Sequence, residues 1–280
     1  MKINKDSLKA RANNISSELK IPQNVVYNRF FYDAFLSRLA ISKYKNNFVL
    51  KGGLYLSSLL GIDMRSTMDI DFYIKKVLME REKILRIINE ISLINIDDGI
   101  IFQILKINNI RNDDKYGGFQ VLILGKLDNV KCQFGIDVAT GDPIIPKEQN
   151  YEYKCLVTGE SLPLKVYSLE SVVAEKIETI LSKGISNSRS KDFYDLFVLK
   201  KFEIENIDKR VLIKAFNEVC SYRNFVINKN DALKMIDMIS SNNEILIRWK
   251  SYCRNVGYVG ELSFYEVINS IRNWIEIIFN

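Results

Sequence analysis

The spacing of apolar residues divides the first part of the chain into predicted helices and strands. Residues 6–19 and 22–43 repeat apolar side chains every three to four positions, which predicts two helices, with Pro22 in the first turn of the second. Later apolar runs are shorter or alternate with polar residues, which is typical of strands. Strands are predicted over residues 48–53, 67–74, 99–107, 118–127, 130–140, 151–158 and 162–167. Two more helices are predicted between them, over residues 54–60 and 77–93.

After Ser168 the spacing is helical almost to the end of the chain. The sequence therefore predicts a mixed α/β domain over residues 1–167, including the N-terminal helices, and a helical domain over residues 168–280. The order of elements predicts an α+β fold in which helices cover one face of a mixed sheet. Of the 280 residues, 47% are hydrophobic, which is enough to bury a sizeable core.

Two carboxylates interrupt the strand predicted over residues 67–74. Asp69 and Asp71 are two positions apart, so their side chains point to one face of the strand, and Ile70 and Phe72 point to the other. Like charges this close repel each other unless something positive lies between them. One interpretation is a divalent metal, because carboxylate oxygens suit Mg²⁺ and Mn²⁺. The other is an edge strand with a solvated polar face.

Two further features extend this pattern. Asp137 lies in an apolar strand, where a carboxylate is costly unless it is paired or metal-bound. If its strand is next to that of Asp69 and Asp71, three carboxylates converge; otherwise Asp137 is a strand-end residue before a turn. Gly52 and Gly53 separate a strand from a helix, and such a turn lets the backbone approach a phosphate closely. Turns also need glycine for conformational reasons alone.

Composition narrows the possible chemistry. The chain contains no histidine, which excludes Ser-His-Asp and Cys-His catalysis and histidine-ligated zinc. Its four cysteines form no C-x-x-C pair, so neither a disulfide framework nor a zinc site is expected. No apolar run approaches the roughly 20 residues that cross a bilayer, and the N-terminus lacks a secretory signal, so a cytoplasmic protein is expected. The net charge of +6 suits an anionic partner such as nucleic acid, although a composition rich in Ile, Asn and Lys explains part of it.

The segment LKGGLYLSSLLGIDMRSTMDIDFYI, residues 50–74, resembles the nucleotidyltransferase signature of the DNA polymerase β superfamily. Both have a hydrophobic-Gly-Gly turn, a short helix and a D-x-D strand. Within that superfamily the segment is most similar to the AbiEii/AbiGii toxin family, which pairs Lys-Gly-Gly with Arg-x-Ser or Arg-x-Thr before the aspartates. The resemblance implies these nucleotide-binding residues: Lys51, Gly52, Gly53, Arg65 and Thr67.

The resemblance continues downstream. Residues 168–181 are similar to a family helix that carries A-E-K, and residues 189–199 to a helix with R-x-K-D-x-x-D-L. It implies roles in catalysis or nucleotide positioning for Lys176 and Asp192. Arg189, Lys191 and Asp195 are weaker candidates. The alternative from the residues themselves is an interhelix salt bridge of Asp192 with Lys176 or Lys191.

The family resemblance implies a metal-dependent nucleotidyltransferase with a polymerase-β-like core and a helical C-terminal domain. Asp69, Asp71 and Asp137 are the expected ligands of Mg²⁺ or Mn²⁺, and an NTP is the expected substrate. The implied biology is a toxin of a toxin–antitoxin or abortive-infection system that transfers NMP to RNA, with the tRNA acceptor end as the expected target. A cognate antitoxin that forms no stable complex with the toxin is expected, and neither DNA nor a membrane. The rival hypotheses are a transferase that modifies a protein hydroxyl and a non-catalytic nucleotide- or RNA-binding module.

Overall fold

The computed structural model of the chain describes residues 4–110 and 117–280. It divides into two compact units. The first, called the sheet unit, comprises Met1–Gly141 and Gln149–Val166. The second, called the helical unit, comprises Asp142–Glu148 and Tyr167–Asn280.

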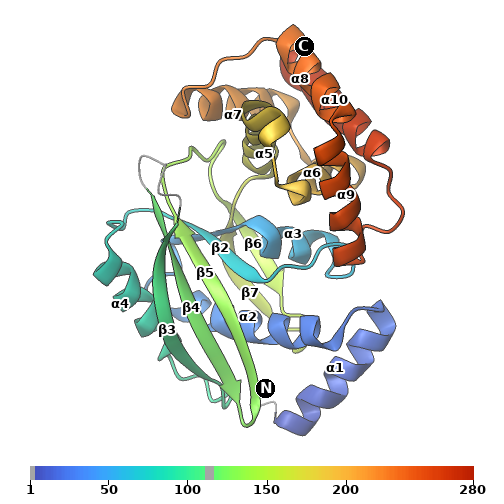
Figure 1. Ribbon diagram of the computed structural model, residues 1–280. Coiled ribbons are helices and arrows are strands. Elements are labelled where there is room, and N and C mark those ends of the chain that lie inside the picture. The colour runs from blue at the N-terminus through green and yellow to red at the C-terminus, as the bar shows by residue number, and fades with distance from the viewer. Residues whose placement is uncertain (1–3, 111–116) are drawn as a thin grey trace. The chain divides into compact units, whose positions relative to one another are not determined.

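The sheet unit is built on a seven-stranded mixed sheet with the strand order β3-β4-β5-β2-β1-β7-β6 (Figure 1). Two neighbouring pairs, β2 with β5 and β1 with β7, are parallel, and the other pairs are antiparallel. The strands are β1 Phe48–Lys51, β2 Asp69–Ile74, β3 Ile101–Ile110, β4 Gly118–Leu127, β5 Val130–Ala139, β6 Gln149–Lys154 and β7 Ser161–Val166.

Helices pack against one face of this sheet. Those of the sheet unit are α1 Lys5–Leu19, α2 Gln23–Ile41, α3 Gly52–Leu60 and α4 Arg81–Ser92. Helix α2 contacts β5 and β7, and α4 contacts β3 and β4. Gly125 makes room for this packing, because a Cβ there would lie 2.5 Å from the Phe31 ring of α2. The mixed sheet with its helices confirms the predicted fold class.

Several boundaries differ from the prediction in an informative way. The strand predicted over residues 48–53 ends at Lys51, and Gly52 and Gly53 form the first turn of α3. Gly52 has φ +64, which favours glycine, so the chain can turn sharply from strand to helix there. Pro22 is the N-cap of α2 rather than a residue of its first turn.

The helical unit consists of six α-helices and two short 3₁₀ segments within its described residues. These are α5 Leu169–Lys183, η1 Gly184–Ser186, α6 Ser190–Phe202, η2 Ile204–Asn206, α7 Lys209–Tyr222, α8 Lys229–Ser241, α9 Asn243–Val256 and α10 Phe264–Phe279. The segment between β5 and β6 belongs to this unit because of two attachments. The buried Asp142 carboxylate pairs with Arg223 at 2.9 Å, and the Ile145 carbonyl accepts from the Ser168 hydroxyl at 2.6 Å.

Two findings concern the helix lengths and the cysteines. No described helix is both long and apolar enough to cross a bilayer. The cysteines Cys132, Cys155, Cys220 and Cys253 are all free.

Candidate functional site

Strand β2 carries the two carboxylates on the face opposite its buried apolar side chains. Burial alternates strictly along the strand, with Ile70, Phe72 and Ile74 buried. Asp69 and Asp71 are half-buried between them. The predicted division of the strand into an apolar face and an acidic face is therefore present.

Strand β5 brings the third carboxylate next to this pair. It runs parallel to β2, with Asp137 directly opposite Asp71 and Gly135 opposite Asp69. Opposed residues on neighbouring strands point to the same face, so all three carboxylates lie on one side of the sheet. Because β2 and β5 lie between other strands of the sheet, the edge-strand alternative for Asp69 and Asp71 is wrong.

The double glycine holds the start of α3 against Asp71. The Gly53 N–H donates to Asp71 Oδ2 at 3.4 Å, and a Cβ at Gly52 would overlap the Asp71 carboxyl group. A helix N-terminus carries partial positive charge, so it stabilises a carboxylate at this position. On the neighbouring strand β1, Lys51 is directly opposite Asp71. The turn, the carboxylate and a cation are thus adjacent.

Arg65 and Thr67 lie next to the same turn. A Cβ at Gly53 would lie 2.6 Å from Thr67 Oγ1 and 3.4 Å from Arg65 Nη2, so only glycine permits this approach. The Arg65 side chain is buried and donates to the carbonyl of Ser66. The Thr67 hydroxyl donates to the Asp69 carbonyl at 3.3 Å. These bonds fix the segment that leads into β2.

The carboxylates have the right chemistry for Mg²⁺ or Mn²⁺, whose preferred ligands are oxygens. Within residues 4–110 and 117–280, however, no three acidic or sulfur-bearing side chains are close enough together to form a metal-holding group. The donor set on one face, Asp69, Asp71 and Asp137, fits a divalent cation by type and by strand register. These three residues would hold it once their side chains turn toward one another.

Two residues that were not predicted from the sequence complete this face. Gln120 on β4 is directly opposite Asp137, and its Nε2 donates to Asp137 Oδ1 at 2.8 Å. Gly135 donates its N–H to Asp69 Oδ1 at 3.3 Å. A Cβ at Gly135 would lie 2.6 Å from that oxygen and 3.1 Å from Gln120 Nε2. A glycine in the middle of an apolar strand signals close approach of another group, and this signal was available in the sequence.

Lys176 and Asp192 belong to the helical unit, where they bind each other. Lys176 Nζ of α5 lies 2.6 Å from Asp192 Oδ1 and 2.8 Å from Asp195 Oδ2 of α6. Arg189 Nε lies 2.5 Å from the second oxygen of Asp192. The salt bridge predicted as the alternative is therefore formed, with Lys176 rather than the exposed Lys191.

Burial and charge act in opposite directions on this group. Burial alone would raise the pKa of Asp192, but Lys176 and Arg189 hold that pKa well below its ordinary value. Burial alone would lower the pKa of Lys176, but Asp192 and Asp195 raise it. Both groups are therefore charged at neutral pH, and the pair links α5 to α6.

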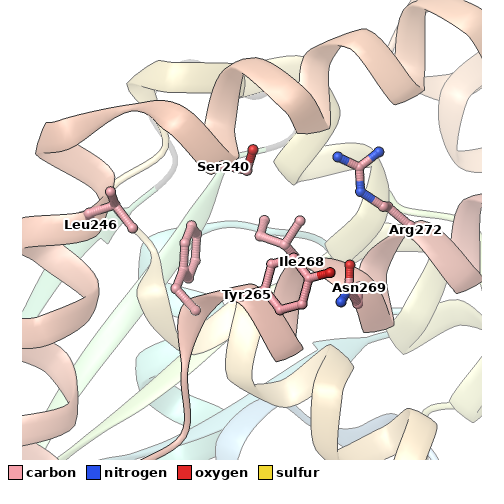
Figure 2. Close-up of a pocket in the computed structure, with 7 residues that line it drawn as sticks. Ser240, Leu246, Tyr265, Ile268, Asn269 and Arg272 are labelled. Carbon is pink, nitrogen blue, oxygen red and sulfur yellow. The ribbon is translucent and has the colours of Figure 1, made fainter.

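A cavity of about 210 Å³ lies among α8, α9 and α10 of the helical unit. Figure 2 shows Tyr265, Ile268, Asn269 and Arg272 of α10 around it, with Ser240 above and Leu246 to one side. The described residues that line it include none of the predicted site residues.

Solved structures share this fold. The crystal structure of a "putative nucleotidyltransferase from H. pylori" matches with a TM-score of 0.53 at 15% identity, covering 92% of this chain and 96% of that one. The crystal structure of JHP933 from Helicobacter pylori matches with a TM-score of 0.51 at 16% identity, covering 92% and 93% of the two chains. At these identities the likeness concerns the fold. No curated protein matches the chain.

The family model described as "Nucleotidyl transferase AbiEii toxin, Type IV TA system" matches residues 34–269. The match begins within α2, includes the glycine turn and all three carboxylates, and extends into α10. This chain therefore belongs to the AbiEii nucleotidyl transferase toxin family of type IV toxin–antitoxin systems.

Proposed function

We propose that this protein is a metal-dependent toxin that transfers a nucleoside monophosphate from an NTP to an RNA hydroxyl at the tRNA acceptor end. One observation carries the proposal. Asp69, Asp71 and Asp137 lie on one face of two adjacent strands, beside the Gly52-Gly53 turn that opens α3. Glycine-rich turns that bind phosphates and carboxylates that hold metal ions recur in enzymes of phosphoryl transfer.

The proposed reaction forms one bond and breaks one. The oxygen of the RNA hydroxyl bonds to the α-phosphorus of the NTP, the bond from that phosphorus to the bridging oxygen breaks, and pyrophosphate leaves. Asp137 accepts the proton of the attacking hydroxyl. The backbone of Gly52 and Gly53 binds the triphosphate, and Lys51, Arg65 and Thr67 balance its charge or orient it.

Asp69, Asp71 and Asp137 would hold divalent cations, Mg²⁺ or Mn²⁺. Bound there, the cations would favour ionisation of the attacking hydroxyl and neutralise charge on the triphosphate and the pyrophosphate. Gln120 and the Gly135 N–H keep two of the carboxylates oriented through the hydrogen bonds described above.

The family implies a cognate antitoxin. In our proposal this antitoxin acts without a stable complex with the toxin, and the protein works in the cytoplasm. Lys176 and Asp192 are proposed, from the family motifs alone, to take part in catalysis or nucleotide positioning. Because they also form a buried salt bridge, the test of this role must separate activity from folding.

The test is incubation with each α-labelled NTP, Mg²⁺ or Mn²⁺, and unfractionated tRNA, followed by separation of RNA and protein. Label in RNA that is absent with Asp69→Ala supports the proposal. Label in protein instead would identify the rival transferase that modifies a protein hydroxyl, such as one on the antitoxin. No label in either pool, together with normal growth of cells that express the protein, would favour a non-catalytic nucleotide- or RNA-binding module.

A further inference from the structure

Strands β3, β4 and β5 bury one face and expose the other. Along β4, Val121 and Ile123 are fully buried, whereas Leu122 and Leu124 between and after them are half-buried. Figure 1 shows the three strands as long neighbours in the sheet. We call the second face the open face. It includes Lys106, Leu122, Leu124, Lys126, Lys131 and Gln133.

The strand register makes the open face continuous with the carboxylates. Lys106 of β3 is opposite Leu122 of β4, Leu122 is opposite Gly135 of β5, and Gly135 is opposite Asp69 of β2. Opposed residues share a face, so this line crosses four strands on one side of the sheet. The hydrogen bond from Gln120 to Asp137 crosses between β4 and β5 on the same side.

The charges on these three strands have one sign except at the proposed site. Within β3, β4 and β5 the charged residues are Lys106, Lys126, Lys131 and Asp137. Lys126 and Lys131 are directly opposite each other, an arrangement in which like charges repel and destabilise a sheet. Lys126 Nζ donates to the uncharged amide oxygen of Gln103 at 3.1 Å. A polyanion on this face would relieve the repulsion.

The face also has the dimensions and the polar groups for a nucleic-acid strand. Lys131 lies six residues before Asp137 on β5, about 20 Å at the usual rise of a strand, which spans several nucleotides. The exposed amides of Gln103 and Gln133 can hydrogen-bond to phosphates and 2′-hydroxyls. The half-buried Leu122 and Leu124 offer apolar contact to sugars and bases.

We propose that the open face is the track on which the RNA substrate lies, with its acceptor end at Asp137 and its backbone over Lys106, Lys126 and Lys131. This inference rests on the proposed function, because it assigns the acceptor of the same site. It names a binding surface outside the glycine turn and the carboxylates.

The test measures RNA binding without NTP or metal, so that it does not depend on transfer. The full chain and its Lys106→Gln/Lys126→Gln/Lys131→Gln variant are titrated with labelled unfractionated tRNA at several salt concentrations. A Lys9→Gln/Lys45→Gln/Lys83→Gln variant is the matched control, since it loses the same charge at exposed positions of the same unit. Equal thermal unfolding of all three proteins shows that folding is unchanged.

The expected result is a fall in affinity of at least tenfold for the open-face variant and of less than twofold for the control. The slope of log affinity against log salt should fall by about 2, because each phosphate contact to a single strand contributes about 0.7. A photoreactive amino acid at Gln133 should crosslink the RNA, and one at Lys83 should not.

Three results would overturn the inference: equal affinities of the two variants, no crosslink from position 133, or no binding of tRNA by the unmodified protein. The first two, obtained with an enzyme that labels tRNA, would move the track elsewhere and leave the proposed function intact. No tRNA binding together with label in a protein acceptor would remove RNA as the substrate and retain the transferase.

Discussion

Asp71 is the residue at which the parts of the proposed site meet. It accepts from the Gly53 N–H and is opposite both Asp137 and Lys51. We predict that Asp71→Asn lowers NMP transfer by at least a hundredfold, because the neutral amide is a poor metal ligand. Thermal stability without metal should change little, because the lost repulsion from the neighbouring carboxylates is offset by the lost attraction of the α3 N-terminus.

The matched control for this variant is Asp97→Asn. Asp97 is exposed and has φ +54, a conformation that asparagine tolerates well. Label transfer should be unchanged in this control. Retention of more than a tenth of the activity in Asp71→Asn would remove Asp71 from the metal-binding set.

Gly135 supports a second prediction at the scale of a residue. In Gly135→Ala the new methyl group would lie 2.6 Å from Asp69 Oδ1, so the carboxylate must move. We expect at least a tenfold loss of transfer, since small displacements of reacting groups have large effects on rate. Pre-steady-state measurement of label transfer tests this. Unchanged transfer with unchanged stability would show that the position of Asp69 is not critical.

Two residues next to this site, Gln120 and Gly135, could not be assigned to it from the sequence alone. The alternation along β2 was sufficient to predict that Asp69 and Asp71 share a face, because side-chain direction in a strand depends on position alone. The importance of Gln120 and Gly135 depends on register. Gln120 is opposite Asp137 only because β4 and β5 pair as a hairpin, and Gly135 is opposite Asp69 only because β5 also pairs with β2.

At the scale of elements, local pairings were predictable and distant ones were not. The strands predicted over residues 118–127 and 130–140 are separated by two residues and pair as the β4–β5 hairpin, whose turn has a positive φ of 51 at Asp128. The parallel pairing of β2 with β5 joins segments separated by a helix and two strands, so no local pattern determines it. One of the two attachments of residues 142–148 to the helical unit depends on Arg223, eighty-one positions beyond Asp142.

The link between α5 and α6 gives the third prediction. Lys176→Met removes the cation that the buried carboxylates of Asp192 and Asp195 share. Breaking a buried ion pair in this way costs about 3–5 kcal/mol. Urea unfolding monitored by circular dichroism should show this loss, and Lys176→Met/Asp195→Asn should recover part of it. If Lys176→Met folds as stably as the unmodified chain, the salt bridge is not structural, and loss of transfer in it would support the catalytic role.

The salt bridge between Lys176 and Asp192 makes the stability of the folded chain depend on pH. The pKa of Asp192 is lower in the folded chain than in the unfolded chain. Asp192 therefore contributes fully to the free energy of unfolding at pH values above its unfolded pKa, about 3.9, and this contribution is lost as pH falls further. The pKa of Lys176 is higher in the folded chain than in the unfolded chain. Lys176 therefore contributes fully to the free energy of unfolding at pH values below its unfolded pKa, about 10.4, and this contribution is lost as pH rises through its folded pKa. The contribution of this pair to the free energy of unfolding should therefore be constant between these two pH values. In Lys176→Met the free energy of unfolding should fall less as pH rises above about 10.4.

At the scale of the whole molecule, metal binding should appear as a change in stability, independently of any reaction. A cation that binds only the folded chain stabilises it by about 2.7 kcal/mol at a hundred times its Kd, which corresponds to roughly 5–10 °C in Tm for a protein of this size. We predict this increase with Mn²⁺ or Mg²⁺ in thermal unfolding of the unmodified chain, and its reversal by a chelator. The cause is the collection of carboxylates on one face of β2 and β5, where a cation replaces their mutual repulsion with attraction.

The design that tests this uses Asp69→Ala and Asp71→Asn beside Asp97→Asn. The first two should unfold at the same temperature with and without metal, because each has lost one of the three ligands. Asp97→Asn should respond as the unmodified chain does, because Asp97 is on an exposed loop before β3. A Tm that rises equally in all four proteins would place the cation away from the three carboxylates, and the chemistry assigned to them would then require another source of positive charge.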